Sequence, residues 1–193
     1  MEDSKSKLRL EMINYLRHNQ AALKKREQDI YQHLFQSTIW KNARTIGVTL
    51  SMPHEINTYP IIEQAWQEGK YIAVPKTFPE THQLKFYRLQ NFNDLRRGFK
   101  NIYEPICTDS KIISSNIMDM IIVPGLVYDY SGYRIGYGGG FFDRYLADYT
   151  NIKVAILYQA QLKPAIPRDS FDIPVDILIT EKKYCCVKKV NDD

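Results

Sequence analysis

The chain has 193 residues, of which 44% are hydrophobic and 25% charged, which suits a globular protein with enough length for a real core. Its net charge of +4 suits anionic small molecules and does not demand a nucleic acid. The charged N-terminus is unlike a signal peptide, no apolar run approaches the roughly 18 residues of a membrane span, and the three cysteines form no disulfide framework. We therefore expect a cytoplasmic monomer that binds neither a membrane nor a nucleic acid.

Two helices are predicted before the first strand. Apolar side chains recur at helical spacing over Lys5–Arg17, and the pattern repeats over Gln20–Phe35. Lys5 and Arg9 are four residues apart, so they share one helix face. Taken alone, these charges are typical of a solvated helix face.

A strand, a helix and a second strand follow with short links. The strands are Thr45–Ser51 and Tyr71–Val74, which Pro75 ends, and the helix between them is capped by Asn57-Thr58 and runs to Glu68. Short links of this kind imply a parallel pair of strands. Glu55 lies just beyond the carboxyl end of the first strand, where open α/β sheets place ligands, although this position taken alone favours a solvated loop carboxylate.

The most informative stretch is 120–149. An apolar run at Met120–Val123 predicts a buried strand, a loop with a glycine cluster over 136–140 follows, and Phe141–Tyr149 has helical spacing. Free amides at a helix start, with glycines that allow close approach, are suited to a phosphate. Arg134 would add a cation and Asp143 a magnesium ligand. A glycine cluster is also often a plain turn, and the chain has no Walker A sequence.

Three more strands are predicted at Leu84–Arg88, on a sheet edge, and at Lys153–Leu157 and Asp176–Thr180. With no linker or repeat in view, we expect a single α/β domain over residues 1–193. Its fold class is a three-layer, open, mostly parallel sheet with helices on both faces, Rossmann-like.

Four segments together resemble the signature of the 5-formyltetrahydrofolate cyclo-ligase, or methenyltetrahydrofolate synthetase, family. The longest, from Pro124, reads PGLVYDYSGYRIGYGGGFFDRYL and resembles the family's P-G-[LV]-x-[FY]-D and G-x-R-[LI]-G-x-G-x-G-[YF]-[YF]-D patterns. The others are KSKLR from Lys5, LSMPHEINT from Leu50 and FDIPVD from Phe171. The resemblance spans Lys5 to about Thr180, but the middle of the chain carries none of it.

The resemblance implies specific site residues. For ATP they are Lys5, Ser6, Lys7, Leu8, Arg9, Arg134, Ile135, Gly136, Tyr137, Gly138, Gly139, Gly140, Phe141 and Phe142. For the folate they are Leu50, Glu55, Tyr137, Gly138, Gly139, Gly140 and Phe141. Arg134 and Glu55 would serve catalysis, and Asp143 and Asp172 would hold Mg²⁺.

The resemblance implies ATP-dependent closure of 5-formyltetrahydrofolate to 5,10-methenyltetrahydrofolate through an iminium phosphate. Such chemistry needs no protein nucleophile. The chain departs from the family pattern in three places: Phe141-Phe142 stands where Tyr-Tyr is frequent, Gly139 where some members have lysine, and Phe171 where histidine is frequent. These changes bear on affinity more than on the type of reaction.

Three other interpretations stay open. The chain could be an α/β enzyme that uses ATP with another acceptor, or a noncatalytic module that senses phosphate. An RNA-binding protein would fit the pI of about 8.8 and the 14 tyrosines, but the aromatic residues are not interleaved with basic ones.

Overall fold

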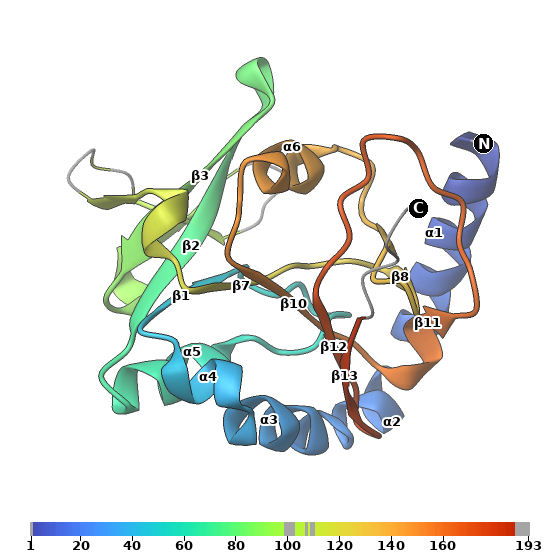
Figure 1. Ribbon diagram of the computed structural model, residues 1–193, viewed down its shortest axis with the longest axis horizontal. Helices are drawn as coiled ribbons and strands as arrows, with labels where there is room; N and C mark the ends of the chain where they lie inside the picture. The colour runs from blue at the N-terminus through green and yellow to red at the C-terminus, as the bar shows by residue number, and fades with distance from the viewer. Residues whose placement is uncertain (1, 99–102, 107, 109–110, 188–193) are drawn as a thin grey trace.

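The computed structural model describes residues 2–98, 103–106, 108 and 111–187. A mostly parallel eight-stranded sheet runs through the molecule, in the order β13-β12-β10-β7-β1-β2-β3-β6 (Figure 1). Its strands are β1 Thr45–Val48, β2 Tyr71–Phe78, β3 Gln83–Leu89, β6 Ile112–Ile113, β7 Met120–Ile122, β10 Ile152–Ile156, β12 Ile177–Ile179 and β13 Tyr184–Cys186. The five strands from β12 to β2 are parallel, whereas β13, β3 and β6 pair antiparallel.

Two small sheets and six α-helices complete the described part of the chain. The small sheets contain β11 Leu162–Lys163, β8 Val127–Asp129 and β9 Arg134–Ile135, and β4 Leu95–Arg97 and β5 Tyr103–Pro105. The helices are α1 Glu2–His18, α2 Gln20–Lys24, α3 Glu27–Gln36, α4 Thr38–Asn42, α5 Tyr59–Gln67 and α6 Phe141–Ala147. Short 3₁₀ turns occupy Pro79–Thr81, Phe92–Asp94, Ser115–Ile117 and Gln159–Gln161. None of the helices in the described ranges is long and apolar enough to cross a membrane.

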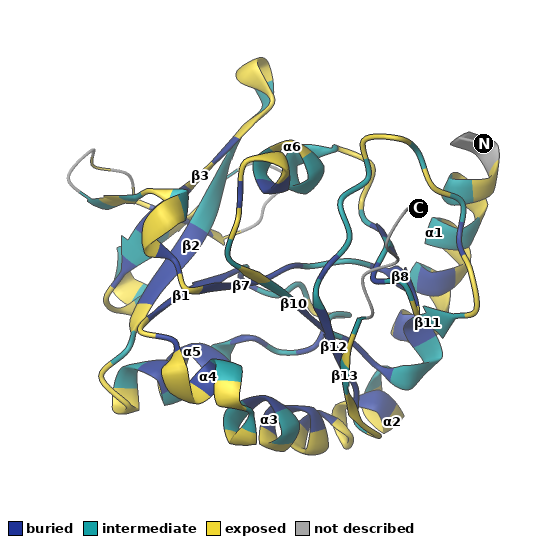
Figure 2. Ribbon diagram, in the orientation of Figure 1, coloured by how far each residue is buried: buried dark blue, intermediate teal, exposed yellow. Residues whose placement is uncertain are grey.

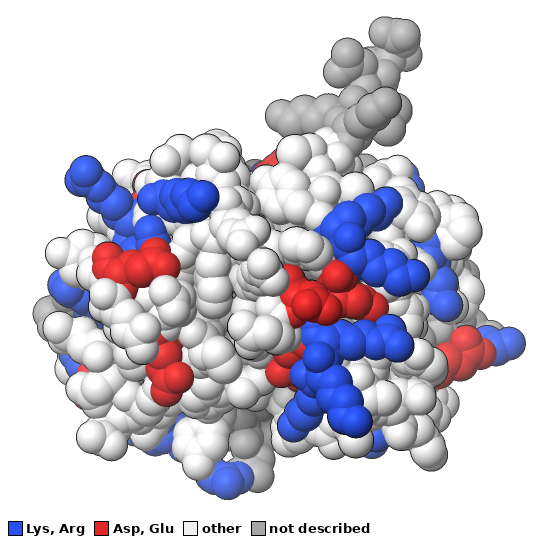
Figure 3. Space-filling model, turned by 90° about the horizontal axis from the view of Figure 1, so that it is seen from below, with Lys and Arg blue, Asp and Glu red and all other residues white. Residues whose placement is uncertain are grey.

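The two faces of the sheet bury separate apolar clusters. Successive side chains of a strand point to opposite faces, so Met120 and Ile122 of β7 join one cluster and Ile121 joins the other. Helices α3, α4 and α5 lie along the first face and α6 lies over the second (Figure 1). The strands between them are buried, while the outer sides of the helices are exposed (Figure 2). The surface seen from the α3–α5 side carries charges of both signs close together (Figure 3).

The order of the strands creates a natural ligand crevice. From β1 the chain proceeds to β2 on one side, and it later returns to place β7, β10 and β12 on the other side. The direction of winding therefore reverses between β1 and β7. Open α/β sheets bind ligands beyond the carboxyl ends of the strands at such a reversal.

The prediction of a mixed α/β fold with a large, mostly parallel sheet is confirmed. The finer grouping as a three-layer, Rossmann-like fold stays a prediction. So does the assignment of all 193 residues to one domain.

Several predicted boundaries were wrong. The stretch Gln20–Phe35 is not one helix, because the chain turns at Lys25–Arg26 and α3 starts afresh at Glu27. A carboxylate in the first turn favours this start, and Glu27 is buried there as a hydrogen-bond acceptor. A break of this length is too short to disturb the helical spacing of the apolar side chains. A further helix, α4, precedes β1, whose own end falls at Val48 instead of Ser51.

Pro75 does not end β2, which continues to Phe78. Strand β1 pairs with β2 only as far as Ala73, so the side of Pro75 that lacks an N–H faces no ladder partner. Beyond this point β2 pairs only with β3, and the two form an arm that extends past the rest of the sheet (Figure 1). Strand β3 was predicted at the sheet edge, but β6 pairs with its outer side.

Two further differences from the predicted elements follow β7 and β12. The predicted loop after β7 contains a pair of strands, and one more strand follows the predicted last strand. Strands β8 and β9 form a hairpin ahead of the glycine cluster. Asp129, at the end of β8, is fully buried, and its carboxylate accepts hydrogen bonds from Arg168 and from two backbone amides of the turn. Asp129, the aspartate of the P-G-[LV]-x-[FY]-D pattern, thus stabilises this hairpin. Strand β13 pairs antiparallel with β12 and closes that edge of the sheet.

Candidate functional site

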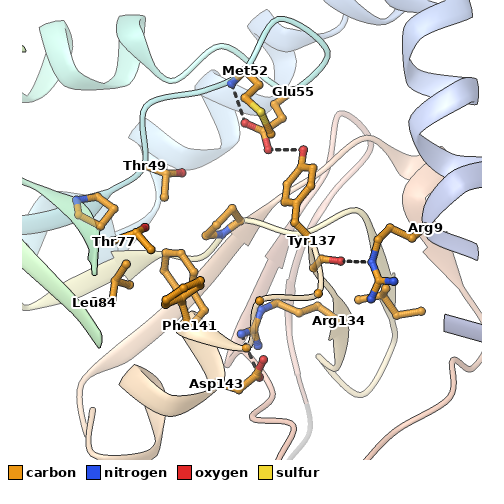
Figure 4. Close-up of a pocket in the computed structure, with 18 of the residues that line it drawn as sticks. Arg9, Thr49, Met52, Glu55, Thr77, Leu84, Arg134, Tyr137, Phe141 and Asp143 are labelled. Carbon is orange, nitrogen blue, oxygen red and sulfur yellow. Dashed lines mark hydrogen bonds and ion pairs between the residues drawn. The ribbon is translucent and has the colours of Figure 1, made fainter. Parts of the chain in front are cut away.

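A cavity of about 840 Å³ opens over the carboxyl ends of β1, β2 and β7. Most of its lining comes from five widely separated segments of the chain: α1, the loop after β1, the β2–β3 arm, the glycine loop and the turn before β12 (Figure 4). Four of these five carry the sequence segments on which the family resemblance depends. Residues that are distant in sequence therefore meet at the crevice that the strand order predicts.

One face of α1 forms a side of the cavity. Lys5, Arg9, Ile13 and Arg17 all line it, because residues four apart in a helix share a face. Ser6 also reaches the cavity, but Lys7 and Leu8 do not. Lys7 points to solvent and Leu8 packs against the core. Of the five predicted residues of this segment, the structure thus brings three to the cavity.

Lys5 is held between two carboxylates. Its Nζ lies 2.6 Å from Oδ2 of Asp169 and 2.6 Å from Oδ2 of Asp172. Burial lowers the pKa of Lys5, but the hydrogen bonds and charges of the two aspartates outweigh it, so that its pKa is raised. Asp172 was predicted at the site from the sequence, whereas Asp169 was not. The turn 169–172 brings both to the same ammonium group.

The glycine loop passes in front of α1. Nε of Arg9 donates to the carbonyl of Gly136 at 2.7 Å and so ties the start of the loop to the helix. Gly138 and Gly140 have positive φ values of 90° and 64°, a conformation that favours glycine. Gly140 is the N-cap of α6. The glycines therefore allow the loop to turn back into a helix start at the cavity wall.

Arg134 reaches the cavity, but other groups of the protein occupy its guanidinium. Nη2 lies 3.0 Å from Oδ1 of Asp143, and Nη1 donates to the carbonyl of Ile173. The Arg134 side chain is only 3% exposed. Oδ1 of Asp143 also accepts from the amide of Ile173. Arg134 thus fixes Asp143 beside the residue that follows Asp172.

Glu55 lies across the cavity, in the loop after β1. Its Oε2 accepts from the amide of Met52 and its Oε1 from the hydroxyl of Tyr137, each at 2.7 Å. Burial raises the pKa of the Glu55 carboxyl, and the two hydrogen bonds counteract this only in part. In the described residues Glu55 makes no ion pair. A desolvated carboxyl of this kind is suited to a polar ligand with a donor group.

The cavity has two unlike sides, which we name here. The charged wall consists of Lys5, Arg9, Arg17, Arg134, Asp143, Asp169 and Asp172. The apolar wall consists of Leu50, Met52, Pro75, Leu84 and Phe141, with Thr49 and Thr77 among them and Glu55 at its edge. Figure 4 shows Tyr137 between the two walls, with its ring directed at Glu55.

The sequence predicted much of this lining. The structure brings Leu50, Glu55, all of 134–142, Asp143 and Asp172 to the cavity. It also adds residues that were not predicted: Ile13, Arg17, Thr49, Met52, His54, Pro75, Thr77, Leu84, Tyr103, Glu104, Pro124, Asp169 and Phe171. The four-residue spacing from Lys5 could have revealed Ile13 and Arg17. The arm residues depend on how far β2 extends past β1, which only the folded chain shows.

The predicted magnesium ligands fit the chemistry of that ion. Asp143 and Asp172 offer carboxylate oxygens at one cavity, and Mg²⁺ is commonly held by one or two carboxylates with substrate phosphates and water. Each carboxylate also has a cationic partner, Arg134 or Lys5. The described residues contain no cluster of three or more His, Cys, Asp or Glu that could hold a metal alone. Tight binding without phosphates is therefore not expected.

Comparison with known proteins gives a consistent result. A model of the 5-formyltetrahydrofolate cyclo-ligase family matches residues 1–181. The chain is 31% identical over 174 residues to 5-formyltetrahydrofolate cyclo-ligase of Haemophilus influenzae, a match that covers 86% of this chain and 93% of the relative. It is 32% identical over 145 residues to that of Escherichia coli K12, with 73% and 80% covered. The solved structure of Aquifex aeolicus 5,10-methenyltetrahydrofolate synthetase matches with a TM-score of 0.84 at 27% identity, over 98% of this chain and 95% of that one.

Proposed function

This chain belongs to the 5-formyltetrahydrofolate cyclo-ligase family, and we propose that it converts 5-formyltetrahydrofolate and ATP to 5,10-methenyltetrahydrofolate, ADP and phosphate. The observation that carries the proposal is the convergence of four separate segments of the family signature on one cavity. The cavity has a charged wall and an apolar wall, which suits a polyphosphate and a pterin side by side.

The chemical difficulty of the reaction is that a formamide oxygen leaves poorly. Transfer of the γ-phosphoryl group from ATP to that oxygen gives an iminium phosphate and ADP. N10 of the folate then attacks the iminium carbon and loses its proton, and phosphate departs. The substrates supply the reacting atoms, so the protein needs only to align them and to neutralise charge on the transferred group. No protein nucleophile takes part in this scheme.

In this proposal the nucleotide lies against the charged wall. Arg9 projects from α1 to the glycine loop, whose amides would bind phosphate oxygens, and Lys5 projects to the turn 169–172 beside it. Lys5 would exchange one of its carboxylate partners for a phosphate. Arg134, with its guanidinium on Asp143, would act mainly by fixing that carboxylate. Asp143 and Asp172 would hold magnesium, which when bound supplies positive charge beside the phosphates.

The folate lies against the apolar wall in the same proposal. Leu50 and Phe141 offer flat or branched apolar surface to a pterin ring. The carboxyl of Glu55 makes no ion pair in the described residues, and burial raises its pKa. It would accept a hydrogen bond from a ring N–H and so orient the substrate. Phe141 and Phe142 keep the stacking surface of the frequent tyrosines without their hydroxyls.

The direct test is the absorbance of methenyltetrahydrofolate formed from 5-formyltetrahydrofolate with and without ATP. We expect product only when ATP and magnesium are both present. A Lys24→Ala variant, altered on an exposed helix away from the cavity, is the matched control for loss of a lysine and should keep the wild-type rate. Absence of product with all components would overturn the proposal, and ATP hydrolysis driven by a different acceptor would favour the alternative enzyme.

Three broader expectations remain proposals: that residues 1–193 form one domain, that the protein is a monomer, and that it works in the cytoplasm. Light scattering on the eluted protein tests the oligomeric state. A mass of about twice the 22.6 kDa of the chain would show a dimer.

A further inference from the structure

One tyrosine hydroxyl connects the two loops that face each other across the cavity. Tyr137 belongs to the glycine loop, and its Oη lies 2.7 Å from Oε1 of Glu55, in the loop after β1 (Figure 4). The same Oη lies 2.8 Å from Nε2 of His54. These three side chains form one hydrogen-bonded unit, here called the bridge.

The proton count of the bridge fixes its direction. A phenol hydroxyl has one proton to donate, and an ionised carboxylate can only accept. With Glu55 ionised, the proton of Tyr137 must therefore point at Glu55, and Nε2 of His54 must carry the proton that is donated to Tyr137. His54 thereby orients the hydroxyl onto Glu55 instead of leaving it free to rotate.

Few other contacts hold the Glu55 carboxylate. Besides Tyr137, its hydrogen-bond donor in the described residues is the amide of Met52, which lies in the same loop. The hydroxyl of Tyr137 is thus its link to a separate segment. Burial raises the pKa of both Glu55 and Tyr137 and, together with the charge of Arg17, lowers the pKa of His54. Tyr137 nevertheless keeps 38% of its surface exposed, so the bridge lies at the surface of the cavity, within reach of a bound ligand.

The glycine loop depends on contacts with other segments of the chain to keep its conformation. Tyr137 stands between Gly136, whose carbonyl is bound by Arg9, and Gly138, which has a positive φ. Glycine-rich backbone loses much conformational entropy when it is ordered. A ligand that orders this loop would also place the ring of Tyr137, and with it the carboxylate of Glu55.

We propose that Tyr137 and His54 are positioning residues for Glu55, and that their bridge couples the binding of nucleotide to the binding of folate. The identity of the two ligands rests on the proposed function. The bridge forms without ligand, and a nucleotide bound at the glycine loop would restrict the loop around Tyr137 further, so that the folate meets a Glu55 that is held more firmly in place. The coupling is reciprocal, so folate must tighten nucleotide binding by the same factor.

The first test measures this coupling by titration calorimetry. The affinity for 5-formyltetrahydrofolate is compared with and without a saturating nonhydrolysable ATP analogue and magnesium. We expect nucleotide to tighten folate binding about tenfold in the wild type and less than about twofold in Tyr137→Phe. Nucleotide affinity measured alone should stay within about twofold, because the lost hydroxyl contacts Glu55.

Three further variants separate positioning from general damage. His54→Gln keeps a donor near Tyr137 and should retain most of the coupling, whereas His54→Leu should lose a large part of it. Tyr145→Phe is the matched control, because the Tyr145 hydroxyl is buried and has no hydrogen-bond partner in the described residues. It should bind both ligands like the wild type. Full coupling in Tyr137→Phe, or none in the wild type, would overturn the proposal.

The second test needs no ligand and so separates the bridge from the proposed function. Hydrogen exchange at the amide of Met52 should be about three- to tenfold faster in Tyr137→Phe than in Tyr145→Phe, because a freed Glu55 no longer holds that amide. Unchanged exchange would show that Tyr137 does not position Glu55. Faster exchange in a protein that binds neither ligand would support the positioning role and overturn both the coupling and the proposed function.

Discussion

The two walls of the cavity solve the problem of buried charge in opposite ways. On the charged wall each buried ion has a partner: Lys5 lies between Asp169 and Asp172, and Arg134 pairs with Asp143. On the apolar wall Glu55 has only neutral donors, the Met52 amide and the Tyr137 hydroxyl. Burial accordingly raises the pKa of Glu55.

The difference indicates which kind of ligand each wall is suited to bind. Pairing avoids the large cost of an uncompensated buried charge, and an incoming phosphate or metal can replace one partner of a pair as its counter-ion. A desolvated carboxylate that is bound only by neutral donors is not neutralised by a counter-ion, so its charge remains available to a ligand. We therefore expect substitutions on the charged wall to affect both stability and nucleotide binding, and substitutions at Glu55 to affect mainly the binding and reaction of the folate.

Replacement of Glu55 should have the largest effect on catalysis. Glu55→Gln keeps the shape of the side chain but cannot hold a negative charge, so the folate loses its orienting acceptor. We expect kcat/KM for ring closure to fall about 100-fold, equivalent to about 2.7 kcal/mol, with nucleotide affinity nearly unchanged. Steady-state absorbance assays and nucleotide titration measure the two quantities. An equal loss of kcat/KM and of nucleotide affinity would show that the two walls do not bind separate ligands.

Asp143→Asn should cost about tenfold in rate and raise the magnesium concentration needed for activity. It should also lower the free energy of unfolding by about 1–3 kcal/mol, because the charge of Arg134, which is 3% exposed, loses its counter-ion. The sequence analysis predicted Asp143 as a magnesium ligand but did not predict its ion pair with Arg134, on which this loss of stability depends. Magnesium titration and urea unfolding measure the two effects, and normal values for both would remove Asp143 from the metal site.

Lys5→Met should weaken nucleotide binding about fivefold, because one phosphate contact is lost and the apolar stem is kept. It leaves Asp169 and Asp172 without their shared cation, so stability should fall by about 1–2 kcal/mol. Lys24→Met, on an exposed helix, is the matched control and should change neither. Unchanged nucleotide affinity in Lys5→Met would leave Lys5 with a purely structural role.

The smallest effect concerns pH. The pKa of Glu55 is raised in the folded chain, whereas in the unfolded chain it takes the ordinary value of about 4.3. Between these values the folded protein binds more protons, so the contribution of Glu55 to stability is fully present below the unfolded value and is lost as pH rises through the folded one. The free energies of unfolding of the wild type and of Glu55→Gln, compared from about pH 4 to about pH 8, should diverge, with the wild type losing stability relative to the variant as pH rises. Parallel curves would contradict the raised pKa.

The sequence predicted best where local rules and tertiary structure agree. The βαβ unit of β1, α5 and β2 and the strand, glycine loop and helix around Gly136–Gly140 follow from apolar periodicity and turn residues. The position of Glu55 beyond a strand end was predicted in the same way. Lys7 was predicted at the site from its place in a motif, but helix geometry turns it to solvent.

The rest depended on contacts that no local pattern contains. Pro75 continues a strand because β1 stops short of it, and Asp169 joins the cavity because its turn meets α1. The link between Tyr137 and Glu55 joins residues 82 apart. Each of these requires knowledge of which segments pack together, and a single sequence does not give it.

The most direct test of the division between the walls is a crystal structure with a nonhydrolysable ATP analogue, magnesium and 5-formyltetrahydrofolate. We predict phosphate oxygens within hydrogen-bonding distance of Lys5 and of the glycine-loop amides, and the pterin ring between Leu50 and Phe141 with a donor on Glu55. A pterin on the charged wall, or a triphosphate beside Glu55, would contradict the account.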